Sequence, residues 1–590
     1  MKAFSAFKRK HLIFPLFLIL LTGSFLFVFR SCHPESEDTR FEKYIEKIFR
    51  EEMQTNTLNL HYTLAYPEDY GIQDYEISLG TMEPEALEKS LKETEKFHKI
   101  LESFDPSGMS RENQILYDIL SLEFSSQVSL GSSYLLQEPL GPNLGIQAQL
   151  PILLSEYTFR TSADIKDYFS LLAQLPAYFQ GILEFERKKA EEGLFMSDTS
   201  ADRIIQQCQS FMETGRENYL CTMFQQRVDE LLDKKQISSQ QAESFIQMHE
   251  KLMDQFVFPA YLTLSQGLEK LKGQGKNSGG LVYLENGKDY YEYLIQRTVG
   301  DYRSPEKILQ SLFEQLQTDY GKIQAHLAAD PEIIAKSYSL PASDLSPEQM
   351  LDYLQHVITD DFPRLEVEDY EIKYVPESME EFSSPAFYLT PPVDTLTPNT
   401  IYINQSSQVS QAELFTTLAH EGFPGHLYQT VYFGGQEHHP IRELLSCSGY
   451  IEGWATYVES LSYGYASPFL HTDPEVMDFL CLNRSISLCL YSILDLGIHY
   501  QGWNLQTTSD TLGVFGITDQ ETCKEIFQYI VENPANYLKY YLGYLNFVSL
   551  KDRAQKEAGN SFSLKDFHED LLDIGPAPFP VIEKYLFKEE

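Results

Sequence analysis

The sequence of 590 residues predicts a mainly α-helical protein with two lobes and a small β-sheet. Long stretches mix charged and apolar residues with the recurrence typical of helices. One shorter stretch is rich in residues that favour strands, and one glycine-rich stretch interrupts the helical pattern. The clearest helical segments in the first half are 41–54, 83–101, 162–192, 201–234 and 238–272.

The strongest break in composition is residues 273–280, with the sequence GQGKNSGG. We place the boundary between the lobes there. Residues 41–280 are then an N-terminal helical lobe. Residues 281–590 form a second helical lobe that includes the sheet and the motif described below. We expect the two lobes to enclose a cleft rather than to be independent modules.

The strand signals lie between about residues 364 and 405, just before the motif. Segments 365–368, 370–374 and 400–404 alternate in part between apolar and polar residues and are rich in β-branched and aromatic residues. Pro391, Pro392 and Pro398 lie between them and indicate turns. A small sheet should therefore precede the motif helix.

The N-terminus, residues 1–40, is expected to be a membrane anchor or signal followed by a polar linker. A basic stretch precedes the apolar run 12–29, which as a helix would be about 27 Å long, close to the thickness of a bilayer core. The basic flank stays in the cytoplasm, so the body of the chain should be exported. An uncleaved anchor is favoured over a lipid on Cys32 and over a cleaved signal.

The charge of the chain excludes several classes of partner. Acidic residues outnumber basic ones by 86 to 46, which gives a net charge of −40. A nucleic-acid-binding protein needs cationic contacts to phosphates, so we expect no nucleic-acid partner. Contact with a membrane should involve only the N-terminal segment, because no polybasic patch is found elsewhere. With a single spanning segment, a transporter is also excluded.

The motif is His420-Glu421-Gly422-Phe423-Pro424-Gly425-His426, which resembles a zinc-peptidase HExxH motif with a displaced second histidine. Histidines six residues apart lie on nearly opposite faces of a regular helix. Pro424 would clash with the carbonyl of His420 inside a helix, and Gly425 adds backbone freedom. The helix should therefore widen, kink or end between Gly422 and Gly425, so that His426 turns back toward His420.

Two histidines are an incomplete zinc site, and a third ligand is expected downstream. In the segment 451–459, Glu452 and Glu459 are spaced i and i+7 and share one helix face. We expect His420, His426 and Glu452 to hold one zinc ion per chain. Glu459 is either the alternative ligand or a partner that orients a histidine.

Several segments together identify a family resemblance. They are HEGFPGHLYQ at 420–429, EGWATYVE at 452–459, DLGIHYQGW at 495–503, YYLGYL at 540–545 and FHEDLLDIGPAPFPVIE at 567–583. The chain resembles a bacterial HEGxPGH family, a domain of unknown function whose members are regarded as candidate zinc metallopeptidases. That family is similar to the helical gluzincins, such as thimet oligopeptidase and angiotensin-converting enzyme. The likeness covers most of the chain beyond residue 40.

The resemblance implies roles for individual residues. His420, His426 and Glu452 would be zinc ligands and Glu421 the general base. His499 would face the cleft, and Tyr540 would stabilise the oxyanion. Family members often carry an arginine shortly before the aspartate of the DxGIH segment, a feature that this chain lacks.

The sequence thus predicts an exported, membrane-anchored zinc peptidase that cleaves peptide bonds by a metal-activated water. Glu421 would accept the water proton and pass it to the leaving amine, with Tyr540 or His499 as a donor to the oxyanion. Tyr402–Asn404 is the candidate edge strand for binding the peptide substrate. The alternatives are a non-catalytic peptide-binding or surface protein on the same scaffold, and a zinc hydrolase of a non-peptide amide.

Overall fold

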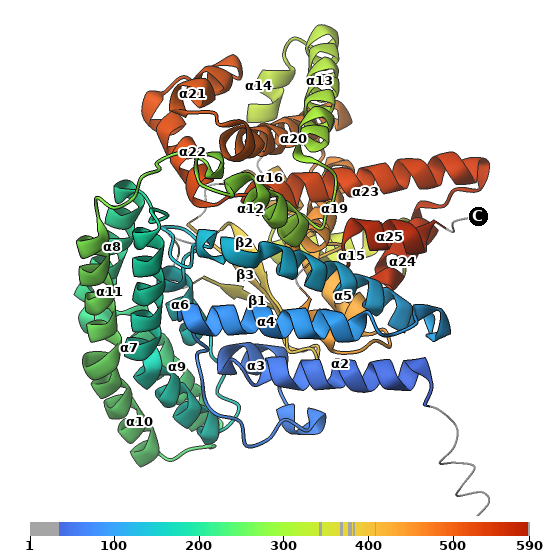
Figure 1. Cartoon of the computed structure of the whole chain (residues 1–590). Coiled ribbons are helices and arrows are strands. Elements are labelled where there is room, and N and C mark those ends of the chain that lie inside the picture. The colour runs from blue at the N-terminus through green and yellow to red at the C-terminus, as the bar shows by residue number, and fades with distance from the viewer. Residues whose placement is uncertain are drawn as a thin grey trace, which may run out of the picture.

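The computed structural model describes residues 35–340, 345–365, 370–375, 380, 384–406, 409–445 and 447–587. It confirms a mainly helical protein with a small three-stranded sheet (Figure 1). The predicted membrane segment 12–29 and Cys32 lie outside the described residues.

The first half of the chain is a succession of helices. They are α2 (Glu37–Met53), α3 (Thr57–Thr63), α4 (Pro84–Leu101), α5 (Arg111–Leu130), α6 (Ile146–Ser155), α7 (Ser162–Glu191), α8 (Asp198–Glu213), α9 (Tyr219–Asp233), α10 (Ser239–Leu252) and α11 (Phe258–Leu271). Helix α2 begins inside the predicted linker because the Ser36 hydroxyl accepts a hydrogen bond from the Thr39 N–H at 3.2 Å. The predicted helix 201–234 is two helices, because Gly215 takes a positive φ of 52° and Asn218 caps α9.

The second half contains the sheet and the motif. Its elements are α12 (Gly287–Leu294), α13 (Pro305–Ala329), α14 (Ile333–Tyr338), α15 (Pro347–Val357), β1 (Tyr370–Tyr374), β2 (Ala386–Leu389), β3 (Asn399–Ile403), α16 (Gln411–Glu421), α17 (His426–Gly434), α18 (Ile441–Leu444), α19 (Ser448–Phe469), α20 (Pro474–Leu496), α21 (Leu505–Val514), α22 (Gln520–Glu532), α23 (Asn536–Ala558), α24 (Leu564–Ile574) and α25 (Phe579–Leu586).

The helices pack around several apolar cores. Helices α7 to α11 form a bundle on the left of Figure 1, with one core running through it. The largest core lies around α16, α19, α20 and α23, and α5 contributes Ile115 and Ile119 to it. Helices from both sides of residue 280 therefore share a core. The division into 41–280 and 281–590 stays a prediction.

The sheet has the strand order β1-β3-β2. Strand β3 is parallel to β1 and antiparallel to β2, and Tyr402 pairs with Lys373 on one side and with Phe387 on the other. Ile401 and Ile403 project from β3 into the core shared with α15 and α16. The sheet thus lies directly against the motif helix. Strand β2, which the sequence analysis missed, is at an edge of the three-stranded sheet.

Helices α19 and α23 cross in close contact at three glycines. A methyl group on Gly453 would overlap the backbone of Gly543, and a methyl group on Gly543 would overlap the carbonyl of Gly449. Glycine is therefore required for this approach of the two backbones. The crossing sets the position of Glu452, next to Gly453, and of Tyr540, three residues before Gly543.

Among the residues with described positions, one helical stretch, Pro474–Gln501, is long and apolar enough to cross a membrane. It comprises α20 and the π-type turn η10 (Gly497–Gln501). In its most apolar window, 56% of the residues are buried inside the protein, and α20 packs against α13, α19 and α23. Its apolar character is accounted for by its place in the core.

Replacing Gly543 with alanine should destabilise the protein, because the new methyl group forces α23 away from α19. We expect the free energy of unfolding to fall by about 1–3 kcal/mol, the usual cost of overpacking a core. Chemical denaturation of the protein measures it.

Gly464→Ala is the matched control, since Gly464 lies inside α19 with nothing within 4 Å of its added methyl group. Its stability should stay equal or rise by up to about 1 kcal/mol, because alanine favours helix over glycine. Equal stability of Gly543→Ala and the wild type would contradict the close crossing.

Candidate metal centre

The motif forms the end of one helix and the start of the next. Helix α16 stops at Glu421, where the Gly422 N–H donates to the Leu418 carbonyl at 2.8 Å, and α17 begins at His426. A methyl group on Gly425 would overlap the carbonyl oxygen of His420, so only glycine permits this return of the chain. Of the three predicted alternatives between Gly422 and Gly425, a widened, kinked or ended helix, the structure has the ended helix.

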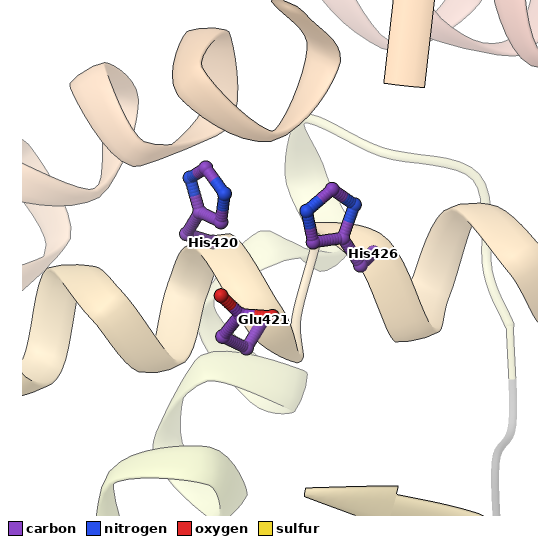
Figure 2. A group of neighbouring side chains, drawn as sticks. All are labelled: His420, Glu421 and His426. Atoms are coloured by element: carbon purple, nitrogen blue, oxygen red, sulfur yellow. The ribbon is translucent and has the colours of Figure 1, made fainter. Parts of the chain in front are cut away.

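This break brings the two histidines together. Their ring centroids lie 4.8 Å apart and the rings are nearly perpendicular, at 85° (Figure 2). The turn between them is held by the buried Trp454, whose indole N–H donates to the Pro424 carbonyl at 2.9 Å. His420 and His426 can therefore bind one ion although they are six residues apart.

Helix α19 brings Glu452 to the same point. Its Oε2 lies 3.7 Å from Nε2 of His420 and 3.5 Å from Nε2 of His426. Ligand atoms around a tetrahedral ion with bonds of about 2.1 Å are separated by about 3.4 Å. The three side chains are thus spaced to share an ion.

Glu459, two helical turns farther along α19, contacts the other nitrogen of His420. Its Oε2 lies 3.1 Å from Nδ1 of His420, and its Oε1 accepts a hydrogen bond from Nε of Arg484 at 2.9 Å. A carboxylate in this position holds the ring and leaves Nε2 free to bind a metal. Glu452 therefore faces Nε2 of His420, and Glu459 faces Nδ1.

Glu421 lies beside the histidines (Figure 2), and ligand atoms of His420, Glu421 and His426 all lie within 4.8 Å of one another. Its Oε2 accepts a hydrogen bond from the backbone N–H of Tyr388 in β2 at 2.9 Å. The strand therefore holds this carboxylate at the edge of the group. A metal ion could be bound by this His–Glu–His group, with Glu452 adjacent to it.

The charges of the site depend on each other. Burial alone would lower the pKa of His420, but the neighbouring carboxylates of Glu452 and Glu459 raise it to about 10. Burial likewise opposes ionisation of Glu452, yet the neighbouring imidazoles of His420 and His426 and the charge of Lys539 hold its pKa well below its ordinary value. Without a metal, a proton on His420 therefore balances the buried carboxylates.

The group opens into a cavity of about 730 Å³. Its walls come from α16, α19, α20 and α23 and from residues 384–388 of the β2 region, and Tyr540 is part of the lining. Burial raises the pKa of Tyr540, and the negative charges of Glu452 and Glu421 raise it further. This phenol keeps its proton at neutral pH and lies near both carboxylates.

The structure does not bring His499 to the cavity, so the expectation that it faces the cleft was wrong. It lies in η10, where Nδ1 accepts from the Leu281 N–H at 3.2 Å and Nε2 donates to the Ile530 carbonyl at 2.8 Å. Burial lowers its pKa to about 4, so the ring is neutral. Both nitrogens serve to join segments of the backbone.

The expectation that Tyr402–Asn404 is an edge strand was also wrong. Tyr402 lies in β3, which has a strand on each side. Its ring stacks on Phe387 at 4.9 Å, and the Asn404 side chain donates to the Glu380 carbonyl at 2.8 Å. The edge strand that faces the site is β2, whose AFYL sequence after Pro385 is a strand signal that was overlooked.

Sequence analysis also assigned no role to Arg484, which orients Glu459.

Comparison with known proteins identifies the family. A family described as "Bacterial protein of unknown function (DUF885)" matches residues 67–586, so the chain belongs to this family. No curated protein matches the sequence.

Solved structures that share the fold include two candidate lipoproteins. A candidate lipoprotein from Colwellia psychrerythraea is 17% identical with a TM-score of 0.82, covering 94% of this chain and 99% of its own. A candidate lipoprotein of unknown function from Shewanella oneidensis is 16% identical with a TM-score of 0.61, covering 86% and 93%.

Metal binding should release a proton from His420, because an imidazole binds a metal only when that nitrogen is unprotonated. With its pKa raised to about 10, His420 carries the competing proton at neutral pH, and raising the pH removes it. Between pH 6 and 9 the affinity for Zn²⁺ should increase about tenfold per pH unit. Competition with a chromophoric chelator measures this slope, and an affinity independent of pH would contradict it.

Proposed function

We propose that this protein is an exported zinc-dependent peptidase. The observation that carries the proposal is the position of Glu452 Oε2, which lies 3.7 Å from Nε2 of His420 and 3.5 Å from Nε2 of His426, with Glu421 beside the two histidines. Two imidazoles and a carboxylate are a common ligand set of catalytic zinc. The depressed pKa of Glu452 fits an oxygen ligand that must be ionised.

His420, His426 and Glu452 would hold the zinc ion, and Glu459 would keep the ring of His420 in place. When bound, zinc supplies Lewis acidity, which activates water and polarises a carbonyl group at neutral pH. Side chains of the cavity would carry out the proton transfers and stabilise the developing negative charge.

Glu421 would be the general base. Its Oε2 is fixed by the Tyr388 N–H, which leaves Oε1 to accept a proton from water and to deliver it to the leaving amine. A carboxylate held by a backbone donor keeps its direction through both proton transfers.

Tyr540 would donate a hydrogen bond to the oxygen of the attacked carbonyl as negative charge develops there. Its raised pKa keeps the proton on the phenol, and its place in the cavity wall with Glu421 and Glu452 supports this role. It takes this role alone, because His499 is outside the cavity.

The substrate would lie along β2. Residues 385–388 line the cavity, and the outer edge of β2 carries the N–H that reaches Glu421. Because the Tyr388 N–H is bound to Glu421, an extended peptide beside this edge would use the remaining outward backbone groups, such as the Tyr388 carbonyl, whatever its sequence. A peptide is therefore a better fit than a compact amide.

The location outside the cytoplasm rests on the N-terminal segment 12–29 and on the fold. The two solved structures compared above are described as candidate lipoproteins, a class attached to membranes outside the cytoplasm. We propose the same side of the membrane for this chain, with contact to the bilayer only through its N-terminus. The net charge of −40 opposes any nucleic-acid partner.

Glu421→Gln should abolish most of the activity and leave the zinc in place, because the amide keeps the hydrogen bond from Tyr388 but cannot accept the water proton. We expect about one zinc per chain in both proteins and a loss of kcat/KM of about 10²–10⁴-fold. Metal analysis and a digest of a peptide library measure the two effects.

Glu413→Gln is the control for this variant, since Glu413 lies on the same helix and lines the same cavity at a more exposed position. It should change kcat/KM by only a few-fold. A loss of zinc from Glu421→Gln would mean that Glu421 is a ligand, and undiminished cleavage would overturn its role as base.

Tyr540→Phe should lower kcat by about 100-fold with little change in zinc content, because one donor to an oxyanion contributes about 3 kcal/mol. Tyr491→Phe, in a neighbouring aromatic stack with Tyr537, is the control and should leave kcat nearly unchanged. Initial rates on a peptide that the wild type cleaves give kcat for both variants. Equal rates for the two variants would remove Tyr540 from the mechanism.

A further inference from the structure

A second cavity, of about 360 Å³, lies next to β2. Its wall is formed by β2 and β3, by the loop after β2, and by α3 and α6 of the N-terminal half. The apolar and aromatic side chains that define it are Tyr62, Leu153, Phe387, Leu389, Val393 and Tyr402. Its volume is that of a small ligand pocket.

The two acidic side chains in this wall have polar partners. Glu156 forms an ion pair with Arg227 at 2.9 Å and also accepts from the hydroxyl of Tyr402 at 3.4 Å. Glu443 lies 3.0 Å from Nε2 of His438. Because both carboxylates already have polar partners within the protein, the cavity presents mainly apolar surface to a ligand.

Some of that apolar surface is open to water. The side chain of Leu153 is 42% exposed, and Phe387, Leu389 and Tyr402 are half-buried. An open apolar pocket in so acidic a protein is a place where a ligand gains free energy by covering it. The pocket therefore suits an apolar group and disfavours an anionic one.

The second cavity adjoins the metal centre through one strand. Phe387 lines both cavities, and the next residue, Tyr388, donates its N–H to Glu421. Side chains alternate along a strand, so Phe387 and Leu389 face the second cavity while Ala386 faces the core. A peptide lying along β2 would follow the same alternation.

We propose that this second cavity is the specificity pocket of the peptidase and that it receives a bulky apolar side chain of the substrate. The inference rests on the proposed function. The substrate residue beside Tyr388 would direct its side chain toward α16. The residue next to it in sequence, beside Phe387 or Leu389, would direct its side chain into the pocket. The enzyme would then prefer peptides with an aromatic or large aliphatic residue at one position near the cleaved bond.

The test starts from a peptide that the wild type cleaves and places Phe, Ala or Asp at each position around the cleaved bond. At one position, kcat/KM for the Phe peptide should exceed that for the Ala peptide by at least about tenfold. It should exceed that for the Asp peptide by a larger factor. In Leu153→Asp, the ratio of Phe to Ala at that position should fall about tenfold, because a charge now lies in the pocket wall. The exposure of Leu153 makes this variant compatible with folding, which a thermal melt checks.

Leu262→Asp is the matched control, since Leu262 is 47% exposed on α11 and lines neither cavity. It should keep the wild-type ratio. Cleavage without preference for Phe at any position, or an equal ratio in Leu153→Asp and Leu262→Asp, would overturn the specificity pocket and leave the peptidase intact.

A binding measurement separates this inference from the proposed function. The Phe, Ala and Asp peptides are titrated by fluorescence anisotropy into zinc-loaded Glu421→Gln protein, with and without Leu153→Asp. Tighter binding of the Phe peptide that is lost with Leu153→Asp supports the pocket even where the wild type cleaves nothing. Equal binding of the three peptides would overturn it.

Discussion

The structure of the site depends on one close contact within the motif. The backbone of Gly425 lies against the carbonyl of His420 with no room for a side chain, and this contact turns the chain so that α17 starts beside the end of α16. In an unbroken helix the two histidines would lie on nearly opposite faces. Trp454 then fixes the turn from α19, the helix that also carries Glu452 and Glu459. The motif and the carboxylates are thereby joined through α19.

Charge balance explains why this unit can be buried. Two ionised carboxylates removed from water are costly unless positive charge compensates them. In the free protein the compensation comes from a proton on His420 and from Arg484 and Lys539. A divalent ion can replace the proton and satisfy the same carboxylate, so the site is arranged for a cation in either state. The protein supplies this arrangement although its surface is strongly acidic.

Strand β2 connects the candidate metal centre with the second cavity. Its backbone holds Glu421, and its side chains contribute to both cavities. An edge strand can do both because its outer N–H and C=O groups are not used by the sheet while its side chains point to alternate faces. Helices α3 and α6 contribute lining residues to the second cavity, so the N-terminal half takes part in forming it.

The sequence by itself determined the helical class and the core of the site, because both depend on local patterns. The HEGFPGH spacing demanded a helix break, and the spacing of Glu452 and Glu459 put both carboxylates on one face. Only the tertiary structure decided which carboxylate meets which nitrogen, since that depends on how α19 crosses α16. Strand order is likewise absent from local patterns, so β3 was mistaken for an edge and β2 was missed. The burial of His499 could not be predicted from local patterns either. Its segment packs against Gly280 and Leu281, which lie more than 200 residues earlier in the chain, and this long-range contact buries the ring.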